Sequence, residues 1–475
     1  MIYVIAILVL LYAFSFACIP HLLLLNKRPT ATLAWLWALF LFPGIGAVFY
    51  LAVGTERVKR RRRRRQRSFR RQKGLAEEVS LVDGILNKLP HDSPARSLIE
   101  TTSRIIGLPT DAVGEVRLLR NADIFYAALR ERIAQAKTSV HVESFIWRKD
   151  EVGAEFLDLL VAAANRGVRV RLLLDELGCL GLTQRYFRPL IDAGGEFSWC
   201  HTLYPSHRRY FFNLRNHRKL QVIDNRIAFV GGMNFGREYL GRNPALGSWS
   251  DLQVELTGPV VTRLQQVFAE DWFFATGRDE PLDEVADAPT KHELSPVQVL
   301  RTGPDEDDHP MLRTNLALIE AARKRLWISA GYFIPGGTME AALQVARARG
   351  VDVRLLVSEK SEHPLLVKAG RSYYAALLRQ GVRIFEYRRG IEHSKYTVLD
   401  DDMAVIGSSN FDDRSMRLNF ELSVLVHRQT TNHALARQFL EMTGESREIK
   451  RTSFSRRPLH ERMVESVLRL CSPLL

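Results

Sequence analysis

One sequence pattern occurs twice in this chain and constrains its fold more than any other feature. Residues 217–224 and residues 393–400 both read HxKxxxxD. Six residues after each octad comes a glycine-led turn that ends in asparagine, at Asn234 and at Asn410. A single HxK arises easily by chance, whereas two matched octads with matched turns do not. The repetition predicts two similar half-sites that meet in one folded molecule.

The spacing within each octad indicates which side chains share a site. Residues i and i+2 of a strand point to the same face, so His217 lies beside Lys219 and His393 lies beside Lys395. The aliphatic residues after each lysine are typical of a buried strand. Two histidines and two lysines brought together suit the breaking and remaking of a phosphodiester bond. For either octad alone, an ordinary strand with a partly buried histidine is an equally good interpretation.

Each octad ends in an aspartate, seven residues beyond its histidine. On a straight strand this odd offset directs Asp224 and Asp400 away from the histidines, so we expect them to support the site rather than to carry protons. In the turns that follow, glycine permits close approach of the backbone to a ligand. The polar residues of these turns offer hydrogen-bond donors for phosphate oxygens, and they are Asn234, Ser408 and Asn410.

The two turns differ at one position. Gly232 in the first corresponds to Ser408 in the second, so one hydroxyl is missing from the first half. We therefore expect the two halves to contact the phosphate unequally.

The duplication extends well beyond the octads. Residues 165–174 match residues 348–357, each with Arg-Gly-Val after a helical stretch and before a β-rich run. This order indicates a β-α-β unit with a glycine at the helix end, and hence an α/β fold. We expect the following organisation: a membrane hairpin at 1–56, a basic juxtamembrane segment at 57–94, a first repeat at 95–275, an acidic proline-containing linker at 276–296, a second repeat at 297–447 and an amphipathic tail at 448–475.

The N-terminal residues have a different composition. Residues 2–25 are apolar apart from His21, and residues 31–53 carry no charge. Each segment is long enough to cross a hydrocarbon core of about 30 Å. A cleaved signal peptide would need a basic start, which is missing, so we expect a tight membrane hairpin. Pro20 and Pro43 leave a re-entrant segment open as an alternative.

Positive charge is concentrated directly after the second apolar segment. Residues 56–73 hold twelve Lys or Arg against one Glu. This excess predicts a cytoplasmic location for the rest of the chain and attraction to an anionic membrane surface. Of the formal net charge of +14, this run carries +11 and Lys27 and Arg28 carry +2, so the remaining chain is close to neutral. We therefore expect no nucleic-acid substrate, because a domain that binds duplex phosphates is normally basic itself.

Cysteine and carboxylate spacing gives no sign of a metal site. The four cysteines are too few and too scattered for a disulfide framework or a zinc site, which fits a reducing compartment. No acidic cluster has metal-ligand spacing. We therefore expect no metal cofactor.

The doubled octad resembles the motif of the phospholipase D superfamily. Within it, the hairpin and several further segments are similar to the bacterial cardiolipin synthases; these segments are Phe145-Ile-Trp-Arg, Tyr332-Phe-Ile-Pro, Ser361-Glu-His-Pro, Arg371-Ser-Tyr-Tyr and Asn410-Phe-Asp-Asp-Arg-Ser. The resemblance covers nearly the whole chain and is weakest in the acidic linker. It implies a duplicated phospholipase D-like mixed β-sheet sandwich with flanking helices, located at the bacterial inner membrane.

The resemblance also implies a reaction. One histidine becomes a phosphatidyl-histidine intermediate, and the other protonates the leaving alcohol and then deprotonates the incoming one. Histidine suits this because its reference pKa of about 6.5 lies near working pH. Two phosphatidylglycerol molecules would yield cardiolipin and glycerol, with no metal. Asp251 and Glu421 follow their motifs on strand-like runs and are the candidates for orienting the imidazoles.

Some choices stay open at this point. The same site could pass the phosphatidyl group to water, as a phospholipase D does, or could use another donor. The aromatic and basic residues between Tyr204 and Phe212 suit either a lipid-contacting loop or an ordinary surface loop. Apolar residues recur at helical spacing from Leu459, which fits an interfacial helix as well as a helix docked on the core.

Overall fold

The computed structural model describes residues 2–25, 29–54, 86–87, 89–200, 214–242, 247–278, 294–306 and 308–470. The chain divides into two compact units, which are residues 1–64 and residues 65–475. The expectations for the basic run at 56–73 and for the loop at 204–212 lie outside the described residues. The expected linker at 276–296 falls largely outside them as well.

The first unit is helical. It consists of α1 (Ile2–Leu24), α2 (Pro29–Leu41), the short α3 (Ile45–Phe49) and a π-helical turn η1 (Tyr50–Gly54). In the described part of the chain, α1 is the one helix long and apolar enough to cross a membrane. Pro20 lies inside α1 without ending it.

The second apolar segment is broken near Pro43, the residue that left a re-entrant segment open as an alternative. α2 ends at Leu41 and, at 13 residues, is about 20 Å long, which is shorter than a hydrocarbon core. Pro43 and Gly44 (φ 77°) then turn the chain. α3 returns against α2 so closely that a Cβ on Gly46 would lie 2.3 Å from the carbonyl oxygen of Ala38. Residues 29–54 therefore do not form one continuous helix.

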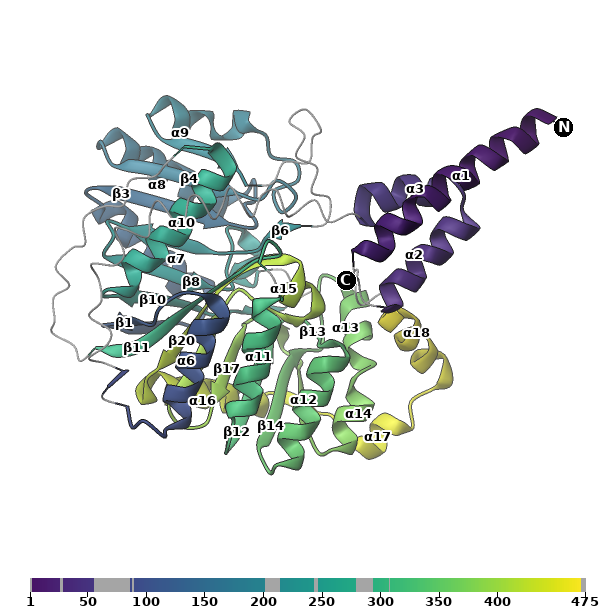
Figure 1. The fold of residues 1–475 in the computed structure, drawn as a ribbon. Coiled ribbons are helices and arrows are strands. Elements are labelled where there is room, and N and C mark those ends of the chain that lie inside the picture. The colour runs from purple at the N-terminus through teal and green to yellow at the C-terminus, as the bar shows by residue number, and fades with distance from the viewer. Residues whose placement is uncertain are drawn as a thin grey trace. The chain divides into compact units, whose positions relative to one another are not determined.

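The second unit contains two mixed β-sheets whose strand orders correspond (Figure 1). The first sheet has seven strands, in the order β2 (Val116–Leu119), β10 (Gln253–Thr257), β8 (Ile227–Gly231), β7 (Leu220–Ile223), β3 (Ser139–Ser144), β4 (Arg169–Leu174) and β5 (Glu196–Trp199). Strands β3, β4 and β5 run parallel, and the remaining neighbours pair antiparallel.

The second sheet repeats this order and adds strands at its edges. Its path runs through β1 (Asp111–Val113), β11 (Ser295–Thr302), β20 (Asn419–His427), β18 (Met403–Gly407), β17 (Tyr396–Leu399), β12 (Arg325–Ala330), β14 (Asp352–Ser358), β15 (Arg383–Tyr387) and β21 (Ser446–Glu448), with β6 (Arg215–Asn216) on β20. Two small sheets pair β13 (Phe333–Ile334) with β19 (Phe411–Asp412), and β16 (Gly390–Glu392) with β9 (Ser248–Ser250). The duplicated α/β fold with mixed sheets is thus confirmed.

Helices follow the strands in the same sequence in both halves. The first half has α7 (Ala122–Gln135), α8 (Glu151–Asn165), η3 (Gln184–Phe187), α9 (Arg188–Asp192), η5 (Arg237–Leu240) and α10 (Val260–Thr276). The second has α11 (Pro310–Ala321), α12 (Gly336–Ala348), α13 (Pro364–Arg371), α14 (Tyr374–Arg379), α15 (Asp413–Arg417) and α16 (Gln429–Gly444). The glycines of the two Arg-Gly-Val segments follow α8 and α12 in the left-handed region, with φ of 85° at Gly167 and 93° at Gly350.

The first repeat begins later than expected. Helix α6 (Pro94–Ile106) contacts α11 and β11, and β1 pairs with β11, so this segment packs on the second half. The expected boundary at residue 95 therefore places about twenty residues in the first repeat that pack on the second half. After β21, α17 (Arg451–Ser455) and α18 (Leu459–Leu470) complete the described chain.

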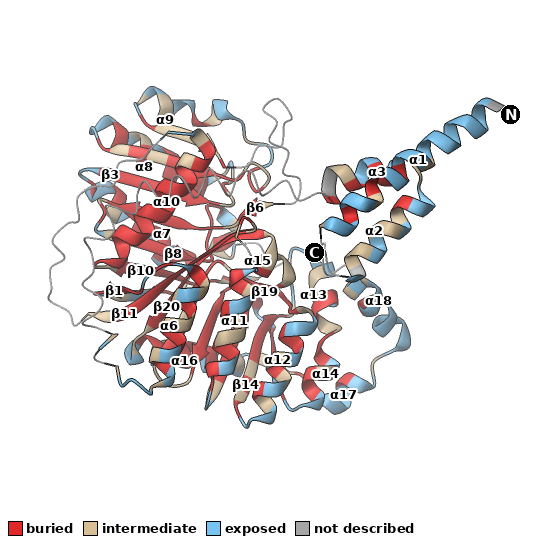
Figure 2. Ribbon diagram, viewed as in Figure 1, coloured by how far each residue is buried: buried red, intermediate tan, exposed pale blue. Residues whose placement is uncertain are grey.

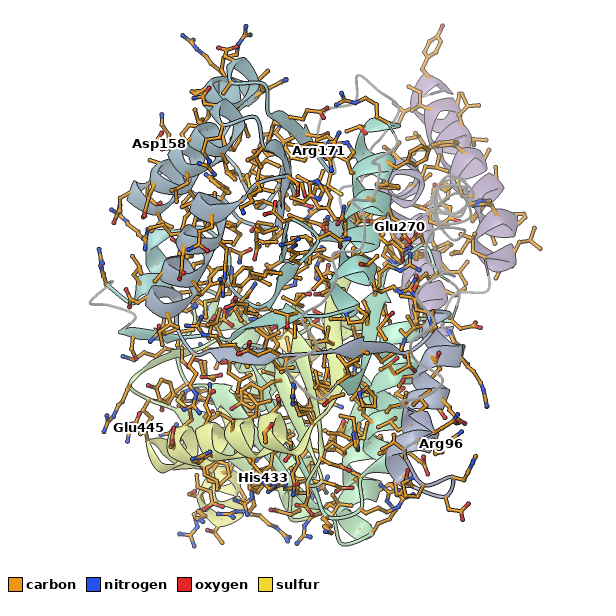
Figure 3. The ribbon with its side chains drawn as sticks, turned by 90° about the vertical axis from the view of Figure 1, so that its left-hand side faces the viewer. Arg96, Asp158, Arg171, Glu270, His433 and Glu445 are labelled. Carbon is orange, nitrogen blue, oxygen red and sulfur yellow. The ribbon has the colours of Figure 1, made fainter. Side chains whose placement is uncertain are left out.

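Helix α10 joins the halves. It contacts β7, β8 and β10 of the first sheet and β1 and β11 of the second. Nearly all its residues are buried, including the charged ones (Figure 2). Arg263 pairs with Asp111 at 3.1 Å, and Glu270 pairs with Arg301. Asp158 on α8 and His433 on α16, labelled in Figure 3, mark exposed outer helices of the two halves, with the packed interior between them.

Candidate active site

The two octads are built in the same way, each with help from the other half. β6 runs parallel to the start of β20, and the backbone N–H of His217 donates to the carbonyl oxygen of Phe420 at 2.9 Å. β16 runs parallel to β9, and the N–H of His393 donates to the carbonyl oxygen of Ser250 at 2.7 Å. Each histidine is thus held at the edge of the opposite half, and its lysine, two residues later, immediately precedes β7 or β17.

The carboxylates of the two halves are exchanged. Nδ1 of His217 lies 3.0 Å from Oε2 of Glu421, which belongs to the second repeat. Nδ1 of His393 lies 2.6 Å from Oδ2 of Asp251, which belongs to the first. Both carboxylates are almost fully buried. The structure therefore brings Asp251 and Glu421 to the imidazoles, each to the histidine of the other repeat.

This contact fixes the tautomer of His217. Burial alone would raise the pKa of Glu421, but His217 and the hydrogen bond to it, with Lys219 and Ser408, hold that pKa below its usual value. An ionised carboxylate only accepts hydrogen bonds, so Nδ1 of His217 carries the proton. Burial lowers the pKa of His217, with Glu421 opposing this. The neutral ring consequently presents the lone pair of Nε2.

The cationic form of His393 is disfavoured as well. Burial is the largest cause, and the charge of Lys395 adds to it, so that the pKa of His393 falls to about 4 despite Asp251. Nζ of Lys395 lies 2.8 Å from Nδ1 of His393. His393 is therefore neutral at pH 7 as well.

The two lysines are buried cations in the same site. Nζ of Lys219 donates to the carbonyl oxygen of His217 at 2.7 Å, and Nζ of Lys395 donates to that of His393. Burial lowers the pKa of Lys219 to about 7, and the charge of Lys395 contributes to this. Burial lowers the pKa of Lys395 also. A bound anion close to both lysines would offset the cost of burying their charges and would reduce the repulsion between them.

The octad aspartates lie at the far ends of their strands. The Asp224 carboxylate accepts hydrogen bonds from the backbone N–H groups of residues 137–139, at 2.7 to 3.1 Å. The Asp400 carboxylate accepts from those of residues 323–325, at 2.7 to 3.1 Å. Both residues have positive φ, 53° and 46°. Each aspartate thus ties the turn after its octad to the start of a neighbouring strand, β3 or β12, away from the histidines.

Two of the expected phosphate-binding side chains are engaged elsewhere. The Ser408 hydroxyl donates to Oε2 of Glu421 at 2.5 Å and accepts from the N–H of Leu422 at 3.0 Å. The Asn234 side chain accepts from the N–H of Ile146 at 3.0 Å and donates to the Tyr239 hydroxyl. These contacts correct the expectation for Ser408, because its proton is directed at Glu421 rather than at the site.

The third such residue, Asn410, is differently placed. Its side-chain oxygen is buried with no hydrogen-bond partner in the structure. Gly331 lies between it and His393, since a Cβ on that glycine would come within 3.4 Å of both. A small cavity of about 30 Å³ is lined by Asn410, Ser409 and Lys395. Asn410 therefore lines this cavity with an unpaired acceptor oxygen, and only the N–H groups of its amide could donate to a phosphate oxygen.

Gly232 has a role that differs from the one inferred from its missing hydroxyl. A Cβ at this position would lie 2.2 Å from Oδ1 of Asp251. The absence of a side chain makes room for the carboxylate that holds His393. At the corresponding position, the Ser408 side chain instead contacts the longer Glu421.

Aromatic residues around the histidines were not identified from the pattern of charges. The Phe145 ring meets His217 edge-on, with centroids 5.1 Å apart, and lies 5.4 Å from Nζ of Lys219. Around His393 stand three rings, at centroid distances of 5.4 to 6.2 Å, belonging to Trp249, Tyr239 and Tyr332. Phe145 and Tyr332 each begin one of the quoted family segments, and Trp249 lies two residues before Asp251. Their closeness to these motifs was the sequence signal that could have identified them as neighbours of the histidines.

Buried carboxyl groups also flank the histidines. Asn216 donates from its amide to Oε1 of Glu143, and Glu392 accepts from the Ser329 hydroxyl at 2.8 Å. Burial raises the pKa of Glu143 and of Glu392. No group of three or more His, Cys, Asp or Glu side chains suited to a metal ion occurs among the described residues.

Comparison with known proteins places these features in a family. The family model described as "Cardiolipin synthase, PLD-like domain" matches residues 129–272 and 316–443, one match for each half. The model described as "Phospholipase_D-nuclease N-terminal" matches residues 2–54.

Curated relatives are similar over almost the full length. The chain is 36% identical over 460 residues to a cardiolipin synthase of Geobacillus sp. strain WCH70, covering 95% of this chain and 90% of that protein. It is 37% identical over 473 residues to cardiolipin synthase 2 of Bacillus cereus, covering 98% and 90%.

A solved structure shares the fold. The phosphatidylserine synthase of Haemophilus influenzae Rd KW20 superposes with a TM-score of 0.60 at 16% identity. The match covers 80% of this chain and all of that one.

Proposed function

We propose that this chain, which belongs to the cardiolipin synthase family of the phospholipase D superfamily, transfers a phosphatidyl group from one phosphatidylglycerol to the glycerol hydroxyl of another and releases glycerol. As a member of that family it is a phosphatidyltransferase that acts on phospholipids. The observation that carries the proposed chemistry is the exchange of carboxylates, because it holds two imidazoles by Nδ1 and leaves Nε2 of each for the substrate.

The first half of the reaction forms a covalent intermediate. Nε2 of one histidine attacks phosphorus as the bond from phosphorus to the headgroup oxygen breaks, and the second histidine gives that oxygen a proton, so glycerol leaves neutral. Both histidines are neutral in the free site. The bound phosphodiester anion favours protonation of the second one. The product is a phosphatidyl group on one imidazole.

The second half returns the site to its starting state. The second histidine, now neutral, accepts the hydroxyl proton of the incoming phosphatidylglycerol. The hydroxyl oxygen attacks phosphorus, and the bond from phosphorus to nitrogen breaks. Because the incoming alcohol takes the place of the one that left, the same groups serve both steps in reverse order.

Positive charge and amide donors stabilise the five-coordinate phosphorus. Lys219 and Lys395 are buried beside the histidines, where their charge acts more strongly than it would in bulk water. Asn410 contributes its side-chain amide. Asn234 and Ser408 position the groups around them, and Ser408 does so through Glu421.

We further propose that the enzyme is anchored in the bacterial inner membrane with its catalytic unit in the cytoplasm. Helix α1 supports the anchor, and the basic run at 56–73 supports the orientation. From the cytoplasmic side, the catalytic unit would meet the phospholipid headgroups of an anionic membrane surface.

The test is a product analysis with purified full-length protein. We incubate it in detergent with labelled phosphatidylglycerol, with and without EDTA, and identify lipid and water-soluble products by mass. We expect cardiolipin and glycerol in equal amounts in both conditions. His433→Ala, an exposed histidine on α16, serves as the matched control for His217→Ala and His393→Ala.

The competing activities give different products. Phosphatidic acid with no cardiolipin would show hydrolysis and overturn the proposed transfer. Phosphatidylglycerol consumed only when a different lipid is added would show another donor or acceptor. Loss of product in EDTA, restored by one divalent ion, would contradict the metal-free chemistry.

A further inference from the structure

Helix α18 is amphipathic, with its apolar residues gathered on one side. Leu459, Met463, Val467 and Leu470 fall within an arc of roughly 80° at 100° per residue. Glu465, Leu468 and Arg469 fall on the opposite side. In a helix docked in the usual way, the apolar arc faces the protein.

This helix is docked the other way round. Glu465 is its buried residue, and it pairs with Arg457. Arg469 pairs with Glu340 of α12 at 2.9 Å and lies 4.2 Å above the Tyr373 ring. Helix α18 also contacts α13 and is partly covered at Leu468. The polar side therefore holds α18 on the catalytic unit.

The apolar arc consequently faces outward. The exposed fractions are 68% for Leu459, 59% for Met463, 59% for Val467 and 81% for Leu470. Figure 2 shows α18 as largely exposed, in contrast to the buried strands of the core. Helix α16 is the reference within the same unit, because it buries Leu435 and Phe439 against the sheet. An outward row of large apolar side chains on a helix fixed by ion pairs indicates an external apolar partner.

Positively charged residues close to the apolar arc indicate that its partner is anionic. Arg462 on α18 is exposed, and so is Arg456 three residues before the helix begins. Cations that border an outward apolar row match the boundary of an anionic bilayer, where headgroup phosphates lie beside acyl chains. The same chain carries an apolar helix, α1, long enough to cross a membrane, and a bilayer that held α1 would be within reach of the catalytic unit.

We propose that the outer face of α18 inserts at the interface of an anionic membrane and gives the catalytic unit a contact with the lipid surface of its own, separate from the N-terminal helix. The occupant is the lipid, with the apolar row among the first acyl carbons and Arg456 and Arg462 at the phosphates. This inference concerns binding and holds whatever alcohol the active site uses.

Spin labelling of the full-length protein tests the contact. A nitroxide is attached at Met463→Cys, or at Glu461→Cys as the matched control on the other side of α18, with Cys471 replaced by serine. Each protein is reconstituted into vesicles of phosphatidylcholine with or without phosphatidylglycerol. Collision of the nitroxide with oxygen, which concentrates in the bilayer, is compared with collision with a water-soluble nickel chelate.

We expect the oxygen-to-nickel ratio at position 463 to exceed that at position 461 severalfold in anionic vesicles, and by less in neutral ones. Arg456→Gln with Arg462→Gln should reduce the anionic value to the neutral one. A label at 463 that meets nickel as often as the control overturns the proposal. A label there that meets neither reagent also overturns it, because residues 2–54 or a second copy would then cover the row.

Two controls separate a lost contact from a lost fold. Met463 and Glu461 are exposed, so their replacement leaves the packing of α18 unchanged, which circular dichroism checks. Turnover on dispersed short-chain substrate should equal that of the parent protein for both labelled variants. Failure of the product analysis described above leaves the collision result interpretable, since it requires no turnover.

Discussion

The two halves of the active site share one plan and differ in the side chain that stands beside each carboxylate. Glu421, which serves His217, also accepts the Ser408 hydroxyl proton. Asp251, which serves His393, is one methylene shorter and lies against Gly232, where no side chain fits. A longer carboxylate braced by a serine and a shorter one beside a glycine reach equivalent positions. The difference between Gly232 and Ser408 is therefore a matter of carboxylate size more than of phosphate contact.

The surroundings of the two imidazoles differ as well. Among the residues that the structure describes, one aromatic ring lies against His217 and three rings surround His393. Burial and the charge of Lys395 lower the pKa of His393 to about 4. The comparison indicates that two chemically alike histidines have been placed in unlike environments, as expected of groups that play different parts in one reaction.

The largest effect tests whether both halves are needed. His217→Ala and His393→Ala should each lower turnover by about 10⁴-fold or more, because each removes one of the two groups that attack phosphorus or move the proton. Turnover on labelled phosphatidylglycerol is the measurement, with His433→Ala unchanged. A variant that keeps most of its activity would break the single-site description.

The exchange of carboxylates is tested next. Glu421→Gln and Asp251→Asn should each lower turnover by about 10²- to 10³-fold, since each imidazole loses its ionised partner. Glu421 raises the pKa of His217, so Glu421→Gln should lower that pKa further and leave that of His393 nearly unchanged. NMR titration of the histidines decides this. A shift of His393 instead would show that the carboxylates act within their own repeats.

The glycine and serine positions provide a matched pair. Gly232→Ala should lower turnover by about 10²-fold, because its Cβ would overlap the Asp251 carboxylate and displace it from His393. Ser408→Ala should cost only about tenfold, since it removes one hydrogen bond to a charged group. Steady-state kinetics with thermal melting as the control measures both. Equal losses would mean that the two positions act alike.

The smallest effect concerns pH. The lowered pKa of His393 means that the unfolded chain binds more protons than the native one between about pH 6.5 and pH 4. The contribution of His393 to the free energy of unfolding should therefore be fully present above pH 6.5 and should decline as the pH falls toward 4. His393→Gln should flatten this slope, measured by chemical denaturation at several pH values. If His393→Gln leaves the dependence of the unfolding free energy on pH unchanged, that dependence comes from other titrating groups.

The activity profile should have a limb on the alkaline side too. The pKa of Lys219 is lowered to about 7, so the free enzyme loses a cation as pH rises through neutrality. kcat/KM should fall there, whereas kcat should fall at higher pH, because a bound phosphate anion restores the proton. Coincident limbs in the two profiles would show that the substrate does not act on this lysine.

Much of this arrangement was predictable from the spacing of residues. Each lysine does lie beside its histidine, although residues 217–219 and 393–395 precede β7 and β17 and do not form the strand that the spacing predicted. The odd offset directed Asp224 and Asp400 away from the histidines, as the structure shows. The position of Asp251 and Glu421 after their motifs marked them as partners of the imidazoles. Which histidine each one meets could not be predicted, because it depends on β6 pairing with β20 and β16 with β9, contacts far apart in sequence.

Other features depend on packing that local patterns do not specify. The transfer of α6 and β1 to the second sheet follows from pairing with β11, which begins some 180 residues later. The break after Leu41 could be suspected from Pro43, but the return of α3 against Ala38 required the structure. The sequence of α18 marked it as amphipathic, while only its ion pairs reveal which side faces the protein.

The exchange of carboxylates has a consequence for how such an enzyme can be assembled. When residue i of one half meets residue j of the other and j meets i, the contact is isologous, as between the identical subunits of a two-fold dimer. Covalent linkage of the halves then adds no chemical group; it replaces a concentration-dependent association by an intramolecular one. It also frees the halves from being identical. Glu421 with Ser408 can differ from Asp251 with Gly232 because a single chain, unlike a symmetric dimer, can change one histidine's surroundings without changing the other's.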